Sequence, residues 1–275
     1  MTRLLSAGFQ RLKKNKVFWG GLILMAAWGI FMPVKMHLDA VQMGYVYRIE
    51  DGFFVYAMGV GVVMAVFCSL FIGTDYNDGT IRNKIIVGGK RSAVYLANAV
   101  VSSVVGLAMC AACLLPCLCV GLPLVGGFTV PVEMVLLTTF TILLLSVAVS
   151  SVFTCIAMVC QYKSVAAVIC ILLAFGFLMT GMVLAQMLEA PKTQEVYSYA
   201  INGEISSVEE PNPGYLEGTK REIVQTLHDI NPGGQAIQCA GMMAVNPYRL
   251  PVYSLAIIVL ATGAGCVLFQ KSDLK

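Results

Sequence analysis

The sequence predicts an all-α integral membrane protein with six transmembrane helices, organised as a single transmembrane domain over residues 1–275. The chain is 58% hydrophobic and only 12% charged, whereas soluble domains carry about a quarter charged residues. Its apolar residues gather in six runs, each long enough to cross a bilayer. No Asp, Glu, Lys, Arg or His lies deep in any of these runs.

A basic amphipathic stretch, residues 2–16, begins the chain. Leu5, Phe9 and Leu12 recur in it at helical spacing, and basic side chains occupy many of the other positions. This pattern is typical of an interfacial helix that lies in the membrane surface. The apolar run 17–34 follows directly. A cleaved signal peptide is the competing interpretation, but the run is long for one and no clear small-residue cleavage site follows it.

Five further apolar runs complete the predicted set. We expect spans at about residues 17–34, 53–73, 93–120, 134–160, 164–188 and 251–270. Residues 93–127 are too many for one straight crossing, so Pro116, Gly121 and Pro123 are expected to end or bend the third helix. Gly59 and Gly61 are expected to permit close helix contact in the second span.

Residues 189–250 form the one sizeable polar segment between the spans, and they hold eight of the fifteen acidic residues. Residues 215–229 and 234–245 are predicted as short helices, the second apolar enough to dip back toward the membrane. Lys and Arg are concentrated at the chain ends and in the loops after spans two and four. The positive-inside rule therefore predicts that both termini are cytoplasmic and that this segment is outside. His37 and His228 are expected to be solvated loop residues.

The ten cysteines predict no structural disulfide, because nine lie inside or at the edges of apolar runs, where thiols act as small hydrophobes. The Cys110-x-x-Cys113 spacing resembles a metal or redox pair, but packing is the favoured interpretation and no metal site is expected. Cys239 lies alone in the polar segment, and its pairing between chains stays open.

A short charged loop, residues 74–92, connects the second and third spans. Gly79 is expected to break the chain, and Thr80 to cap a helix of about two turns that ends at Val87. Two glycines after Val87 supply a left-handed stop. Spacing alone leaves two interpretations open: a plain cytoplasmic turn, or a surface that a partner grips.

One face of this short helix is predicted to be apolar. Ile81 and Ile85 share one side, with Ile86 near them, while Arg82 and Asn83 lie elsewhere. A capped helix with an isoleucine ridge and flanking cations could transmit a push from a partner.

The loop also resembles the signature loop of ABC-2 type exporter permeases. That family has an acid-Tyr-x-x-Gly-Thr-Ile/Leu-Arg-x-Lys block after the second span, then a glycine, a basic residue and Tyr-Leu. The matching positions are Asp75, Tyr76, Gly79, Thr80, Ile81, Arg82, Lys84, Gly88, Arg91, Tyr95 and Leu96. Asp75 stands where Glu is commoner, and Gly89 is an additional glycine. The likeness extends to the basic N-terminal helix, the six spans, the outer Asn231–Gln235 block and the Phe269–Lys275 tail.

The resemblance implies a permease subunit of an ATP-driven ABC exporter in a bacterial cell (plasma) membrane. Such a subunit pairs with a second copy or a paralogous permease, and ABC ATPase subunits dock on the cytoplasmic side. The helix over residues 80–87 would be the coupling helix, and the cargo an amphipathic compound, an antimicrobial peptide or a lipid-like substrate. The implied ATPase-coupling residues are Asp75, Tyr76, Gly79, Thr80, Ile81, Arg82, Lys84, Ile85, Gly88 and Arg91.

No phosphate-binding loop occurs in the chain, so it is not expected to be an enzyme. We expect no catalytic residue and no cofactor here, with ATP and Mg²⁺ bound by the partner ATPase. Membrane lipids are expected partners, and nucleic acid is not.

Hydroxyl side chains recur on one face of the fourth span, at Thr138, Ser146, Ser150 and Thr154. Helix packing is favoured over a lining for a translocation path, because hydroxyls in lipid often bond their own backbone or a neighbouring helix.

Two alternative functions remain. A stand-alone channel or secondary carrier is disfavoured by the lack of charges within the spans. A membrane scaffold or enzyme could act through residues 189–250, although the adjacent His228 and Asp229 do not face each other on a helix.

Overall fold

The computed structural model describes residues 1–44, 46–199 and 205–272. Helices dominate the described residues, and six helical segments are long and apolar enough to cross a membrane. They are α2 (Lys16–Met43), α4 (Tyr56–Asn77) with the short α3 (Glu50–Phe53) before it, α6 (Arg91–Leu124), α7 (Val132–Cys160), α8 (Lys163–Glu189) and α11 (Arg249–Lys271). The prediction of an all-α membrane protein with six such helices is confirmed at this level.

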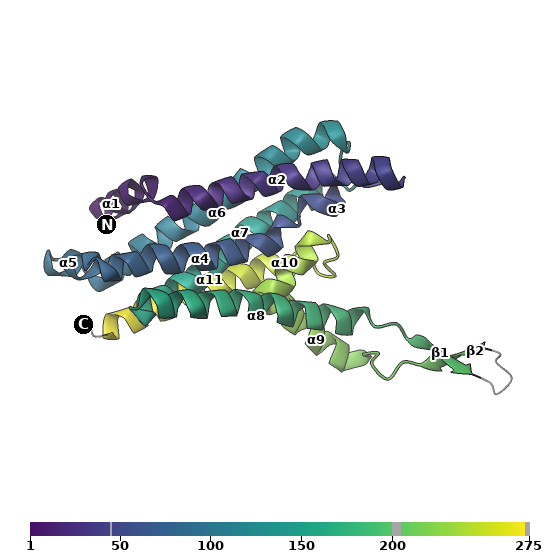
Figure 1. The fold of residues 1–275 in the computed structure, drawn as a ribbon. Helices are drawn as coiled ribbons and strands as arrows, with labels where there is room; N and C mark the ends of the chain where they lie inside the picture. The colour runs from purple at the N-terminus through teal and green to yellow at the C-terminus, as the bar shows by residue number, and fades with distance from the viewer. Residues whose placement is uncertain (45, 200–204, 273–275) are drawn as a thin grey trace.

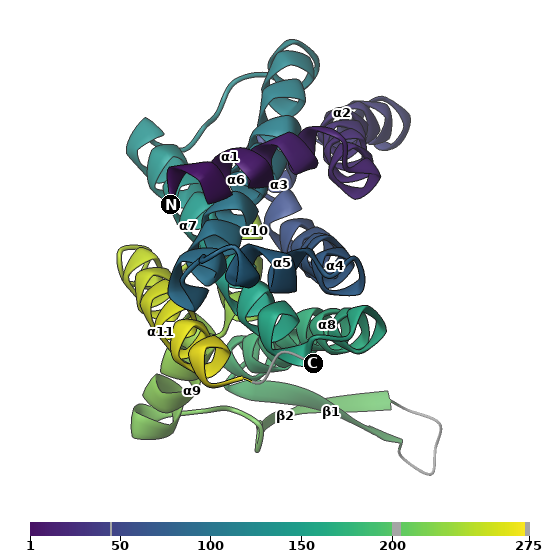
Figure 2. The ribbon, with the colours of Figure 1, turned by 90° about the vertical axis from the view of Figure 1, so that its left-hand side faces the viewer.

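The long helices run side by side, and the remaining elements gather at the two ends of the bundle (Figure 1). At one end lie both termini, α1 (Thr2–Lys13) and α5 (Thr80–Ile86). At the other end lie α9 (Gly218–Ile230) and a hairpin of β1 (Thr193–Tyr199) and β2 (Ile205–Pro211). Figure 2 views the bundle from the α5 end and shows α2, α8 and α11 toward its outside.

Helix α1 packs its apolar stripe partly on the bundle. Leu12 is buried, and Leu5 and Phe9 lie against the core. A Cβ at Gly8 would come within 2.9 Å of Val101 in α6, so α1 and α6 are in close contact. This stripe is therefore not wholly available to lipid.

The first span is longer than predicted. Helix α2 continues through Pro33 to Met43, where Gly44 ends it in the left-handed conformation with φ 70°. A proline removes one backbone hydrogen bond, and neighbouring helices can hold such a helix together. Here a Cβ at Gly29 would come 2.3 Å from the carbonyl oxygen of Cys113, so α2 lies directly against α6. His37 is consequently on a helix, with Nδ1 3.1 Å from the Leu124 oxygen, and not in a loop.

The prolines of the third span do not end it where expected. Helix α6 runs through Pro116 to Leu124, 34 residues in all, or about 51 Å. Cys113, Cys117 and Gly121 are buried on one face of this final part. Packing against α2 and the α3 region therefore maintains the helix where the local sequence favours a stop.

The predicted glycine contacts of the second span are absent, since a Cβ at Gly59 or Gly61 would meet nothing within 4 Å. The close contact lies instead between α6 and α7, where a Cβ at Gly106 would come 2.9 Å from Ser150 Oγ. Glycine allows close approach only where it faces a neighbouring helix, and that orientation was not evident from the sequence.

The polar segment 189–250 forms more structure than the two short helices predicted for it. The β1–β2 hairpin was not predicted, and α9 begins at Gly218. Helix α10 (Pro232–Ala240) starts earlier and ends sooner than expected, and eight of its nine residues are buried. It packs against α4, α7 and α8, so this helix is inserted among the spans. Cys239 is 2% exposed there, and a disulfide to another chain would require α10 to leave the bundle.

Candidate functional site

The turn that carries the predicted site is built around two left-handed glycines. Gly79 precedes α5 with φ 66°, and Gly88 follows it with φ 95°. The amide of Gly88 donates to the Ile85 oxygen at 2.9 Å, and the amide of Gly89 to the Lys84 oxygen at 3.0 Å. These two bonds form the Schellman motif, which ends a helix sharply. A left-handed glycine therefore stands at each end of α5, and the sequence predicted the stop at its C-terminal end.

Thr80 does not cap α5, in contrast to the prediction. The N-cap is Gly79, and no side chain caps the helix. Thr80 Oγ1 lies 2.7 Å from Asp75 Oδ1 and 2.9 Å from the Asp75 backbone oxygen. The hydroxyl therefore ties the start of α5 to the last turn of α4.

Asp75 is the point at which three helices meet. Its side chain is 2% exposed. The carboxylate forms an ion pair with Arg11 of α1, and Lys84 Nζ of α5 lies 3.2 Å from Oδ2. Arg11 also donates to the Phe71 oxygen at 3.2 Å and stacks over the Phe71 ring. Arg11 and Lys84 therefore pair with the same carboxylate.

Burial lowers the pKa of both cations that pair with Asp75. Desolvation, together with the nearby Arg11 charge, lowers the pKa of Lys84 from 10.5 to about 8. Desolvation also lowers the pKa of Arg11 to about 10, against the opposing attraction of Asp78. One buried carboxylate thus faces two cations, and their positive charge is only partly compensated.

The Lys84 contribution to stability is expected to depend on pH. Between about pH 8 and pH 10.5 the unfolded chain retains a proton that folded Lys84 has released, so the free energy of unfolding rises with pH across this window. Lys84→Met should remove that rise. Denaturant unfolding of both proteins in detergent measures the difference, and a pH-independent difference would contradict the prediction.

Residues on either side of α5 contact two other spans. The Tyr76 hydroxyl donates to the Met158 backbone oxygen in α7. After α5, Arg91 Nη1 donates to the oxygens of Gln270 and Ser272 at the end of α11, at 2.9 and 2.6 Å. The two helices that flank α5 are thus bonded to α7 and α11.

The outward face of α5 differs from the predicted one. Ile81 is 1% exposed, and Ile85 packs against the core. Ile86 and Val87 are 72% and 87% exposed, and Arg82 is exposed as well. Helical spacing grouped Ile81 with Ile85 correctly, but it placed Ile86 near them and did not indicate which face rests on the bundle. The isoleucine pair Ile81 and Ile85 therefore anchors α5, and the surface open to a partner is formed by Arg82, Ile86 and Val87.

The hydroxyl residues of α7 lie mostly in its packed interior. Ser146, Ser150 and Thr154 are fully buried. Ser150 Oγ donates to the Ser146 backbone oxygen, and Thr154 Oγ1 contacts Cys68 of α4. Thr138 is partly exposed and stands apart from them. This placement supports helix packing as the role of the three buried residues.

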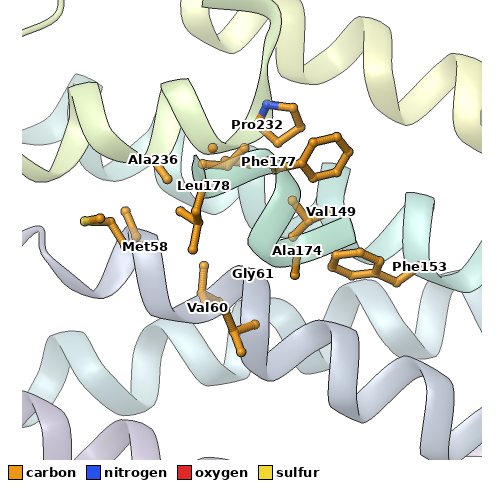
Figure 3. A pocket seen from close by; sticks show the side chains of 14 residues that line it. Met58, Val60, Gly61, Val149, Phe153, Ala174, Phe177, Leu178, Pro232 and Ala236 are labelled. Atoms are coloured by element: carbon orange, nitrogen blue, oxygen red, sulfur yellow. The ribbon is translucent and has the colours of Figure 1, made fainter. Parts of the chain in front are cut away.

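A small apolar cavity of about 20 Å³ lies between α4, α7, α8 and α10. Figure 3 shows Val60 and Gly61 of α4 on one side of it and Leu178 and Pro232 on the other. A space of this size holds about one water molecule, and apolar cavities tend to stay dry. The cavity lies at the interface between α10 and the spans, and it is too small for a substrate.

Comparison with known proteins adds no family assignment. No protein-family model matches the chain, and no curated protein is significantly similar to it.

Proposed function

We propose that this chain is the permease subunit of an ATP-driven exporter of the ABC-2 type, driven through α5 by a separate ATPase subunit. The observation that carries the proposal is the construction of α5. It is a short helix at the end of the bundle with an exposed outer face. Its Thr80 and Lys84 bond Asp75 of α4, and residues of the flanking α4 and α6 contact α7 and α11. The resemblance of residues 71–96 to the permease signature loop supports the same function.

The proposed mechanism is mechanical. An ATPase partner that closes on ATP would press on Arg82, Ile86 and Val87, and the glycine-bounded α5 would move as a unit. Asp75, Tyr76 and Arg91 would pass the displacement to the spans. Hinge motions of this kind use a few terminal residues between packed elements. Two permease chains would enclose a path for an amphipathic compound, antimicrobial peptide or lipid-like cargo.

The proposal places α5 and both chain ends in the cytoplasm. Twelve Lys and Arg residues would then lie inside and six outside, which fits the positive-inside rule. ATP and Mg²⁺ would bind the partner, and this chain would supply no catalytic residue.

Charged substitutions on the outer face of α5 test the proposal. Ile86→Asp and Val87→Asp should each reduce recovery of a phosphate-loop ATPase with the tagged chain at least about tenfold, because exposed apolar anchors often dominate an interface. The measurement is affinity purification from source membranes, followed by mass spectrometry and an ATPase assay of the eluate.

Val46→Asp is the matched control, since Val46 is 94% exposed in the segment between α2 and α3 and is no part of α5. This control should recover the ATPase as the unmodified chain does. Normal recovery with both α5 variants, or ATP hydrolysis by the isolated chain, would refute the proposed coupling.

A further inference from the structure

A second and larger cavity lies at the opposite end of the bundle from α5. It has a volume of about 220 Å³ and opens between the end of α8, α9, and α10 with the residues that follow it. One part of its wall is aliphatic, from Leu188, Ile237, Met243 and Val245. The remainder is polar or charged.

The buried part of the polar wall contains two side chains with unmet hydrogen-bonding atoms. His228 and Gln238 are each 4% exposed. His228 Nε2 and Gln238 Oε1 are buried and have no hydrogen-bond partner among the described residues. His228 is therefore not the solvated loop residue that the sequence suggested. A polar ligand close to these two atoms would supply the hydrogen bonds that they lack.

The Gln238 amide has a defined orientation. Its Nε2 donates to Asp229 Oδ1 at 3.0 Å, and the same oxygen accepts from Gln225 Nε2 at 2.7 Å. An ionised carboxylate can only accept, so Oε1 is the remaining end of the Gln238 amide and requires a donor. Burial lowers the pKa of His228 from 6.5, so its ring is neutral at pH 7 and adds no positive charge.

Opposite charges flank the cavity. Glu189 ends α8, Arg221 lies on α9, and both are exposed lining residues. No ion pair joins them in the residues that the structure describes. The site thus offers an acceptor for an ammonium group and a guanidinium for a phosphate, a combination that fits a zwitterion.

The surroundings of the cavity are those of a membrane boundary. Helix α8 is long and apolar enough to span a bilayer, so its last residue, Glu189, is expected near the lipid head groups. Met243 and Val245, at the cavity wall, are 71% and 70% exposed. They provide an apolar surface beside the charged one, as an amphiphile requires.

We propose that this cavity binds the head group of a zwitterionic phospholipid that carries a primary amine, as in phosphatidylethanolamine. The phosphate contacts Arg221, the ammonium is held by Glu189 with Gln238 Oε1 as a further acceptor, and the acyl chains pass over Met243 and Val245. A cavity of about 150 Å³ holds benzene, so 220 Å³ has room for this head group. The lipid site does not depend on the proposed coupling at α5.

Lipid competition on the purified full-length chain tests the site. Native mass spectrometry in detergent should show about fivefold more adduct with phosphatidylethanolamine than with phosphatidylcholine, which has no ammonium N–H, or phosphatidylglycerol, which has no cation. Arg221→Gln and Glu189→Gln should each lower phosphatidylethanolamine binding about fivefold, a modest effect because both side chains are exposed.

Two neighbouring residues on α9 provide matched controls. Lys220→Gln and Glu222→Gln remove the same charges from side chains outside this cavity and should leave binding unchanged. Soluble glycerophosphoethanolamine should compete only in large excess, because it lacks the acyl chains. Equal binding of the three lipids, unchanged binding in both cavity variants, or competition by the soluble head group as strong as that of the lipid would overturn the proposal.

Discussion

Replacing Asp75 by Asn is expected to destabilise the protein by about 2–4 kcal/mol, because it leaves two largely buried cations facing a neutral amide. The side chains of Arg11 and Lys84 are 29% and 23% exposed, so solvent screens part of their repulsion and the upper end of the range for buried ion pairs is not expected. The volume of the side chain is unchanged, which separates the effect of charge from that of packing. Denaturant unfolding in detergent measures the loss.

A double substitution identifies the cause of this loss. Adding Arg11→Met to Asp75→Asn removes one of the two unpaired cations and should recover part of the lost stability, giving a clear coupling energy in the mutant cycle. Glu222→Gln is the control, because it makes the same change from carboxylate to amide at an exposed position of α9, at the other end of the bundle. It should change stability by no more than about 0.5 kcal/mol. Additive effects of the Arg11 and Asp75 changes would show that the charge cluster does not hold α1 to α4.

The single substitution Asp75→Asn should also have a local effect on α1 and α5. Asp75 is bonded to Arg11, Thr80 and Lys84, so its loss should loosen α1 and α5 before the long helices. Amide hydrogen exchange is expected to become faster in both short helices while α7 stays protected. If α5 couples to an ATPase as proposed, loosening it in this way would reduce the displacement that reaches the spans.

The elements that the sequence predicted well are those with a strong local signal. Long apolar runs predicted the membrane-length helices, and the Gly88-Gly89 pair predicted the end of α5. Proline was the misleading signal. Pro116 is a strong local breaker, but α6 continues through it because α6 packs closely against α2.

The polar parts of the molecule were harder to predict because burial there depends on distant residues. Asp75 was recognised as a motif residue, but its pairing with Arg11 spans 64 positions of the sequence, between separate helices. His228 and Asp229 carry no local sign that α10 will cover them. The β1–β2 hairpin was missed because its strands are short, polar and separate from the apolar runs.

The insertion of α10 among the spans leads to the second large prediction, the effect of Gly233→Ala. A Cβ at Gly233 would lie 2.0 Å from the Phe177 carbonyl oxygen of α8, and backbone atoms cannot yield as a flexible side chain can. The tip of α10 is already held there by Asn231, whose Nδ2 donates to that same oxygen at 2.9 Å. Overpacking of this kind costs about 3 kcal/mol, at the upper end of its usual range. The melting temperature in detergent should fall accordingly.

Gly176→Ala provides the comparison, because it adds the same methyl group one residue before Phe177, at a position where a Cβ meets nothing within 4 Å. That variant should be neutral or slightly more stable, since alanine is the better helix former. The lipid-binding cavity provides a second measurement, because α10 contributes Ile237 and Gln238 to it. Gly233→Ala should therefore weaken phosphatidylethanolamine binding while Gly176→Ala preserves it. Equal stability of the two variants would mean that α10 does not rest on α8.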